Sequence, residues 1–301
     1  MTAPAATPRT LATREEWLAE RKKGIGASDA AALLGLSPWK SPLQLYCEKL
    51  SLIPPDERET EAMEWGLLLE GPIGDRYAAK AKRTVTRPAP FTIYAVEAPA
   101  FLAATFDAFT EEAGDPGVVE VKNVGWQKAE EWAEEPPLYY QIQLQWQLRV
   151  SGFRWGSLAA LVGGQKFVYF DLPRNDRFIA LLEERGAAFW ARVEKQEPPT
   201  PVAMDAGLMG LLYPTQEPGA RVLLPPEAAA WDAQRLRADV LIKEGKALKD
   251  EAEALLKGAI GPHEIGVLPD GAAYSWKSVE RKGYEVKPTT YRELRRKAGK
   301  P

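Results

Sequence analysis

A run rich in β-branched residues, Val118 to Lys122 (VVEVK), constrains the fold more than any other stretch of this chain. It follows the turn-forming residues Gly114 to Gly117 (GDPG), and β-branched residues after such a turn predict a strand. Side chains two positions apart on a strand share a face, so Glu120 and Lys122 are expected to point into one space. The valines on either side of Glu120 then fill the opposite, apolar face.

A second acid lies just upstream. Residues 101–107 (FLAATFD) predict another strand, ending in Asp107, and the turn between the two strands would fold them into a hairpin. Asp107 is then expected beside Glu120. Two carboxylates and a lysine suit a hard cation such as Mg²⁺, which binds oxygen ligands, and a lysine can orient or help deprotonate a bound water. An isolated Glu-x-Lys is more often a cross-strand ion pair, which remains the alternative.

Further short motifs accompany this pair in a fixed order along the chain. They are Arg21-Lys22-Lys23-Gly24-Ile25-Gly26-Ala27-Ser28, Gly66-Leu67-Leu68-Leu69-Glu70 and Tyr140-Gln141-Ile142-Gln143. Together with Asp107 and Glu120-Val121-Lys122, the set resembles the PD-(D/E)xK nucleases, and specifically their YqaJ and lambda-exonuclease-like branch. The resemblance covers about residues 14 to 195. It implies an α/β fold with a PD-(D/E)xK restriction-endonuclease-like core, in which helices flank a mixed central β-sheet.

The resemblance also implies a chemistry, the Mg²⁺-dependent hydrolysis of DNA phosphodiesters, in which Mn²⁺ is expected to substitute. The implied metal ligands are Asp107, Glu120, Val121 and Glu70. Lys122 would position the attacking water, and Gln141 would help to hold the phosphate or the water. Most of the four glutamines between residues 138 and 150 are otherwise expected to be solvated.

Two polar residues near the start of the chain suit a phosphate. The Ser28 hydroxyl can cap a helix that ends near Leu34, and the N–H groups of that helix start, together with Arg21, would make an anion site. The alternative is that Ser28 is only an N-cap and Arg21 only a surface charge. The resemblance favours a pocket for the 5′-phosphate of DNA. Trp39 lies in a proline-rich turn, where it either stacks on a base or anchors the turn to the core.

Composition excludes several other chemistries. The chain has 301 residues with a single cysteine and a single histidine. One cysteine excludes an internal disulfide, a cysteine-ligated zinc site and the four-cysteine cluster of some related nucleases, and one histidine leaves little for Ser-His catalysis. Residues 1–10 lack a signal-peptide pattern, and no apolar run approaches the roughly 18 residues of a membrane span. A cytoplasmic location in a bacterial or phage-infected cell is therefore expected, without a membrane partner.

The pattern of the chain divides it into segments. We predict a disordered lead (1–12), a nuclease domain (13–195), a proline-rich linker (196–226) and a helical arm with a basic C-terminal segment (227–301). From Lys277 onward, nine lysines and arginines stand against three glutamates. Such a segment, interleaved with aromatic residues, suits a phosphate backbone, and a solvated charged tail is the equal alternative.

The resemblance further implies a 5′-to-3′ exonuclease acting on double-stranded DNA ends in phage-type recombination. Its expected partners are a single-strand annealing protein and further copies of the chain in a ring-shaped homo-oligomer, a trimer. The alternatives are an endonuclease of the same fold and a non-catalytic DNA-binding accessory protein. The intact Asp107, Glu120 and Lys122 argue against the second alternative. A third alternative, a metal-independent small-molecule enzyme, has no nucleotide-binding motif such as a phosphate loop in its favour.

Overall fold

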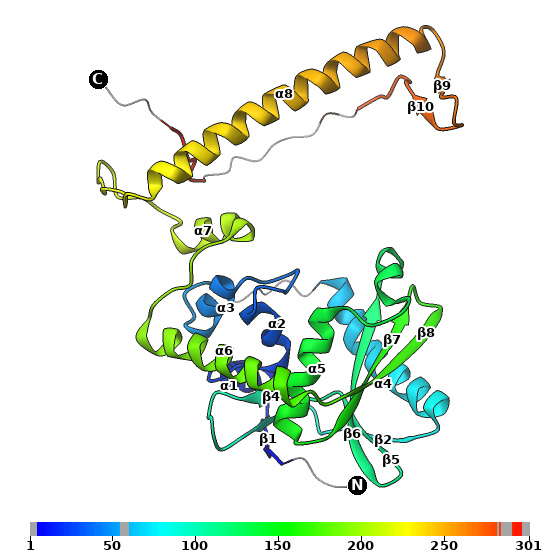
Figure 1. Ribbon diagram of the computed structural model, residues 1–301, viewed down its shortest axis with the longest axis vertical. Helices are drawn as coiled ribbons and strands as arrows, with labels where there is room; N and C mark the ends of the chain where they lie inside the picture. Colours follow the sequence, from blue (N-terminus) through cyan, green and yellow to red (C-terminus); the bar gives the residue numbers. More distant parts are fainter. Residues whose placement is uncertain (1–4, 55–59, 282, 284–290, 297–301) are drawn as a thin grey trace. The chain divides into compact units, whose positions relative to one another are not determined.

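The computed structural model describes residues 5–54, 60–281, 283 and 291–296. The chain divides into two compact units, Met1–Pro214 and Thr215–Pro301 (Figure 1). The boundary falls inside the proline-rich stretch 196–226. The first half of that stretch is part of the first unit, however, because Leu208 on helix α7 (Ala206–Leu212) is buried in the core and Asp205 accepts a hydrogen bond from the Ser41 hydroxyl. The prediction of a linker is therefore wrong for residues 196–214.

A five-stranded mixed sheet organises the first unit. In spatial order its strands are β2 (Thr84–Thr86), β5 (Ala108–Glu112), β6 (Asp115–Val124), β7 (Trp155–Val162) and β8 (Lys166–Pro173). The β6–β7 pair is parallel and the other pairs are antiparallel. The tight β7–β8 turn uses Gly163 and Gly164, both with positive φ (60° and 71°), a conformation that glycine adopts without steric cost. The mixed α/β class is confirmed.

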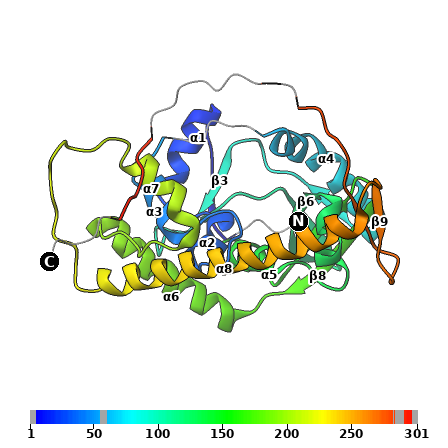
Figure 2. The same cartoon turned by 90° about the horizontal axis from the view of Figure 1, so that it is seen from above.

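Helices cover both faces of this sheet, which explains the apolar character of β6. Val119 and Val121 pack with Ile73 and Tyr77 of α4 (Glu61–Ala81). On the other face, Val118 belongs to the larger core that includes α5 (Leu138–Ser151) and α6 (Asp176–Lys195). Figure 2 shows α4 on the opposite side of the sheet from α5 and α6. The alternation that the sequence predicts for β6 is confirmed.

A second, three-stranded sheet corrects two predictions. Its order is β1 (Thr7–Thr10), β3 (Thr92–Ala95) and β4 (Ala103–Ala104). The predicted disordered lead is wrong for β1, which pairs with β3 as an edge strand, a position that tolerates Pro8. Residues 1–4 lie outside the described residues. The predicted strand 101–107 is also wrong, because only the short β4 forms there and Asp107 comes immediately before β5.

Short helices carry the N-terminal motif and lead into α4. They are α1 (Arg14–Arg21), the 3-10 turn η1 (Ala27–Asp29), α2 (Ala30–Leu33) and α3 (Pro42–Lys49). The Thr13 side chain accepts a hydrogen bond from the Glu16 N–H and so caps the start of α1. Helix α4 begins after Thr60, whose hydroxyl accepts from the Met63 N–H. The residues before it, 55–59, lie outside the described range.

The second unit contains one long helix and a hairpin. Helix α8 (Ala228–Ile260) is followed by β9 (Ile265–Val267) and β10 (Ala273–Ser275), which pair antiparallel. Ile260 is the buried residue of α8, and it lies where a Cβ on Gly266 would come within 2.6 Å of its side chain. Much of the basic C-terminal segment, 284–290 and 297–301, lies outside the described residues. No helix in the described parts of the chain is long and apolar enough to cross a membrane.

Candidate active site

The hairpin β5–β6 places Asp107 beside Glu120. Ala108 pairs with Val119 in the antiparallel register, so the residue before β5 falls opposite the residue after Val119. Asp107 Oδ2 also accepts a hydrogen bond from the Val121 N–H at 2.8 Å. The two acids therefore meet at the same point of the sheet, as the sequence predicts, although a loop residue rather than a strand end supplies Asp107.

The Glu120 carboxylate is buried, at 2% exposed, and fully hydrogen-bonded. Its Oε1 accepts from Lys122 Nζ and from Gln143 Nε2 (2.5 Å), and its Oε2 accepts from Gln147 Nε2 (2.5 Å). Gln143 and Gln147 lie one turn apart on α5 and so face the same acid. A buried carboxylate needs such donors. Because these two amides and the buried Gln145 all form hydrogen bonds, the prediction that most of the four glutamines are solvated is wrong.

Gln141 lies elsewhere on the same helix. Its Nε2 donates to the Pro136 carbonyl at 2.6 Å, just before α5 begins. Residues 141 and 143 are separated by about 200° around an α-helix, since each residue turns about 100°. They cannot both face Glu120, and the structure places Gln143 there. The i, i+4 spacing of Gln143 and Gln147 is the sequence signal that could have identified this pair. The role predicted for Gln141 stays a prediction.

The charges at this point are unbalanced. Burial, then the nearby Glu120 and Glu70, raise the pKa of Asp107 well above its usual range, against the opposing effect of Lys122. Burial and the charge of Glu120 also raise the pKa of Glu70 on α4. Burial alone would lower the pKa of Lys122, but Glu120 and Asp107 raise it above its usual range. Three carboxyl groups thus share one ammonium group. We call Asp107, Glu120, Glu70 and Lys122 the acid cluster.

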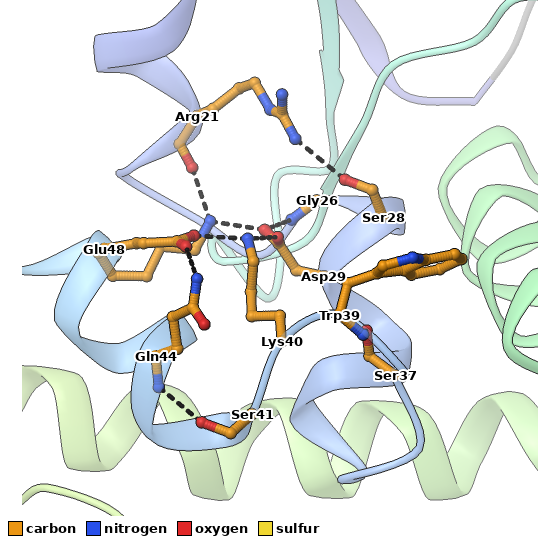
Figure 3. Close-up of polar contacts among 11 residues, drawn as sticks. Arg21, Gly26, Ser28, Asp29, Ser37, Trp39, Lys40, Ser41, Gln44 and Glu48 are labelled. Atoms are coloured by element: carbon orange, nitrogen blue, oxygen red, sulfur yellow. Dashed lines mark hydrogen bonds and ion pairs between the residues drawn. The ribbon is translucent and has the colours of Figure 1, made fainter. Parts of the chain in front are cut away.

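Arg21 and Ser28 also meet. Arg21 Nη2 donates to Ser28 Oγ at 2.9 Å, and the guanidinium lies 4.6 Å from the centroid of the Trp17 ring (Figure 3). Ser28 is not the N-cap of a helix. Gly26 holds that position, and its N–H donates to Asp29 Oδ2 at 3.1 Å. The N-cap alternative for Ser28 is therefore wrong, because Asp29 accepts the capping hydrogen bond.

The pocket at Arg21 and Ser28 lies next to the acid cluster. Arg21, Ser28 and Thr105 line one pocket. The Thr105 carbonyl accepts a hydrogen bond from Gln147 Nε2 at 3.1 Å, and the same amide nitrogen reaches Glu120. A single residue therefore joins the pocket to the acid cluster.

A buried ion-pair network, which the sequence analysis did not identify, lies beside the pocket and holds the backbone of Arg21. Lys49 Nζ donates to Asp29 Oδ2 (2.7 Å) and to the Arg21 carbonyl (2.9 Å), and Lys40 lies 3.7 Å from Asp29 Oδ1 (Figure 3). Burial would raise the pKa of Asp29, but Lys49, Lys40 and Arg21 together lower it below its usual range. Burial lowers the pKa of Lys49, which Asp29 opposes. We call Asp29, Lys49 and Lys40 the Asp29 network.

Comparison with known proteins finds similarity in sequence and in fold. The family model of the YqaJ-like viral recombinase domain matches residues 16–154. The uncharacterized protein YqaJ of Bacillus subtilis (strain 168) is 34% identical over 181 residues, which is 59% of this chain and 56% of that protein. This chain thus spans little more than half the length of that relative.

Solved structures show the same fold. The alkaline exonuclease LHK-Exo from Laribacter hongkongensis superposes with a TM-score of 0.51 at 23% identity, covering 61% of this chain and 94% of that one. The structure of LHK-Exo in complex with dAMP gives a TM-score of 0.51 at 24% identity, with the same coverage. The chain therefore shares the mixed α/β fold of this exonuclease, as its motifs implied.

Proposed function

We propose that this protein is a Mg²⁺-dependent DNA nuclease that degrades double-stranded ends in the 5′-to-3′ direction, because residues 16–154 match the model of the YqaJ-like viral recombinase domain and the fold resembles that of an exonuclease. The observation that carries the proposal is the acid cluster, in which Asp107 lies beside Glu120 and Lys122 donates a hydrogen bond to Glu120. Burial, and then the charge of Glu120, raise the pKa of both Asp107 and Glu70. LHK-Exo, which has the same fold, is named an exonuclease and was solved with dAMP, a nucleotide of DNA.

The residues present fit a hard divalent cation. Asp107 and Glu120 offer carboxylate oxygens, which are the donors that Mg²⁺ and Mn²⁺ prefer. Burial, and then the negative charges of Glu120 and Glu70, raise the pKa of Asp107, and a bound cation would offset both effects. Over the described residues, no three His, Cys, Asp or Glu side chains converge as a ready ligand set. We therefore assign the cation to Asp107, Glu120 and the Val121 carbonyl, with water completing its coordination and Glu70 assisting.

When bound, the cation would offset charge on the scissile phosphate and activate a water. Glu120 and Asp107 raise the pKa of Lys122, which favours its ammonium form, and we assign to it the orientation of the water and the phosphate oxygens. Gln143 and Gln147 hold the Glu120 carboxylate in one orientation. Gln141 is assigned to the phosphate or water only by the family resemblance.

The pocket at Arg21 and Ser28 would hold the 5′-phosphate of the DNA end. A guanidinium and a hydroxyl 2.9 Å apart offer charge-assisted hydrogen bonds to phosphate oxygens. Thr105 lines this pocket and accepts a hydrogen bond from Gln147, which also donates to Glu120, so the pocket and the acid cluster lie next to each other. The ring-shaped homo-oligomer and the annealing partner belong to the same proposal.

Incubation with linear and with covalently closed circular duplex DNA, each with Mg²⁺ or with EDTA, tests the function. We expect degradation of linear DNA alone, only with Mg²⁺, and none by Asp107→Asn. Cleavage of the closed circle would favour an endonuclease of the same fold. Normal DNA binding without cleavage of either substrate would favour the non-catalytic accessory protein.

A further inference from the structure

An exposed aromatic group lies next to the acid cluster and comes from three separate segments. Trp39 belongs to the turn before α3, Lys128 to the 3-10 turn η2 (Trp126–Lys128), and Tyr139 and Tyr140 to the first turn of α5. The Trp39 ring centroid lies 5.0 Å from that of Tyr139, edge-on, and 5.9 Å from that of Tyr140. We call Trp39, Tyr139 and Lys128 the aromatic shelf.

Trp39 is not an anchor of its turn. Its side chain is 57% exposed, whereas Trp132 and Trp146, which do anchor the core, are each 1% exposed. The turn is instead held by its neighbours, because Lys40 pairs with Asp29 and Glu48, and Ser41 caps α3. The indole projects away from these contacts (Figure 3). A large apolar ring held in the open on a fixed backbone suits a ligand that brings a ring of its own.

A cation accompanies the rings. Lys128 Nζ lies 5.1 Å from the Trp39 centroid and 5.6 Å from the Tyr139 centroid. Its ion pair with Glu131 spans 4.0 Å between half-exposed groups, so its charge stays largely available. Tyr139 is oriented by its own hydroxyl, which donates to Glu131 Oε2 at 2.9 Å. Rings for a base together with an ammonium group for a phosphate form the combination that single-stranded nucleic acid recognises.

The shelf is continuous with the acid cluster. Tyr140 contacts Trp39 on one side, and on the other its ring lies 4.9 Å from Lys122 Nζ. A single ring therefore separates the shelf from the lysine at Glu120. Resting on the proposed nuclease function, we infer that the aromatic shelf stacks an unpaired base of the DNA strand being cut and so positions the adjoining phosphate at Lys122. The base must be unpaired, since a base inside a duplex already has both faces stacked.

The test uses a duplex with a short 5′ overhang that carries the fluorescent base 2-aminopurine at one overhang position per substrate. Binding is measured in EDTA, so that the DNA stays intact. In the saturated complex we expect lower emission with the wild type than with Trp39→Ala at one position. Affinity should fall by about 5- to 150-fold in Trp39→Ala, since one base stack contributes about 1–3 kcal/mol. Trp39→Phe, which keeps a ring, should recover most of both signals.

Trp231→Ala is the matched control, because Trp231 is 58% exposed on α8 in the second unit. It should leave the emission unchanged. Lys128→Gln should lower the slope of log affinity against log salt by about 0.7, the value for one single-strand phosphate contact. If emission and affinity are the same in Trp39→Ala as in the wild type, the aromatic shelf does not bind a base. Any loss of hydrolysis in that variant would then come from the lost contact between Trp39 and Tyr140.

The same substrates with Mg²⁺ separate the two proposals. A wild type that hydrolyses DNA while its complex shows no Trp39-dependent emission overturns the aromatic shelf and leaves the nuclease intact. A wild type that shows Trp39-dependent emission but never hydrolyses DNA overturns the nuclease and supports a shelf that binds single strands.

Discussion

The acid cluster and the Asp29 network place buried carboxylates beside lysines in the same unit, yet their charges are balanced differently. Asp29 faces Lys49, Lys40 and Arg21, which outweigh the effect of burial and lower its pKa. Asp107 faces Glu120 and Glu70 with Lys122 as the single opposing cation, and its pKa rises. Burial alone would raise the pKa of both acids. The sign of the shift follows from the number of neighbouring charges.

This difference separates an acid that holds the fold from acids that hold a ligand. A buried ion pair with matched charges is complete and loses stability when one partner is removed. A buried group with surplus negative charge is tolerated when a cation or a substrate supplies the missing positive charge. A Glu-x-Lys pair alone does not distinguish the two cases, so the predictions below test the difference between the two sites.

The largest effect is expected for Glu120→Gln, which removes a ligand charge at nearly constant shape. Hydrolysis of linear DNA should fall by roughly 10³-fold or more, because a metal site supplies several kcal/mol of transition-state stabilisation. The free energy of unfolding in EDTA should change little, since one of three crowded carboxyl groups loses its charge. Glu194→Gln on the exposed face of α6 is the control. Near-normal hydrolysis with Glu120→Gln would make the acid cluster an ordinary ion pair.

Asp29→Asn should have the opposite profile. It leaves Lys49, whose side chain is 6% exposed, without its carboxylate, and the free energy of unfolding should fall by about 3–5 kcal/mol. The depressed pKa of Asp29 means that its stabilisation is present above the usual aspartate pKa of about 3.9 and is lost as pH falls through the lower folded value. Urea titrations of both proteins at several pH values measure this difference.

A double variant isolates the cause of that loss. Asp29→Asn combined with Lys49→Met removes both charges, so it should recover much of the lost stability. If the double variant is as unstable as Asp29→Asn alone, then the carboxylate acts through its hydrogen bond from the Gly26 N–H rather than through Lys49.

Addition of Mg²⁺ should stabilise the folded protein through the acid cluster, and this stabilisation should not depend on the Asp29 network. At a Mg²⁺ concentration 100 times its Kd, the free energy of unfolding should rise by about 2.7 kcal/mol, because the cation binds only the folded chain. Asp107→Asn should abolish the rise in Tm, and Asp29→Asn should retain it despite a lower starting Tm. A shift that survives Asp107→Asn would place the cation elsewhere.

The two sites also differ in how far the sequence predicts them. Glu120 and Lys122 are two residues apart on one strand and Asp107 lies across a hairpin, so local rules bring them together. The strand proposed for residues 101–107 failed because the chain there turns between two sheets, which only tertiary packing decides. Asp29 and Lys49 meet only because η1 and α3 pack together across a turn, so their spacing in the sequence carries no periodic signal.

The glutamines of α5 fall between these cases. Periodicity places Gln143 and Gln147 on one face of the helix, but it does not say which face meets Glu120. The answer depends on how α5 rotates against the sheet, where Leu144 packs so closely on β7 that a Cβ on Gly156 would come within 2.8 Å of it. The motif match therefore pointed to Gln141, which lies two residues before Gln143, the glutamine that contacts Glu120.

Arg21 links the Asp29 network to the pocket, since its backbone carbonyl accepts a hydrogen bond from Lys49 while its guanidinium donates to Ser28. If the pocket holds a 5′-phosphate, wild type should degrade 5′-phosphorylated ends faster than 5′-hydroxyl ends. Arg21→Ala should reduce that preference by about 10- to 150-fold at most, because a hydrogen bond to a charged group contributes about 1.5–3 kcal/mol. Equal rates on both ends in the wild type would mean that the contacts of Arg21 with Ser28 and Trp17 serve the fold rather than a 5′-phosphate.

The smallest effect concerns the two glutamines of the family motif. Gln143→Ala removes one of three donors to Glu120, so hydrolysis should slow by roughly 3- to 10-fold, corresponding to about 0.5–1.5 kcal/mol for one hydrogen bond. Gln141→Ala removes a donor to the Pro136 carbonyl, and its effect should appear first in the Tm. Single-turnover rates and Tm of both variants measure the contrast. A larger loss of hydrolysis in Gln141→Ala at unchanged Tm would mean that this amide leaves Pro136 when DNA binds, and the phosphate role would return to it.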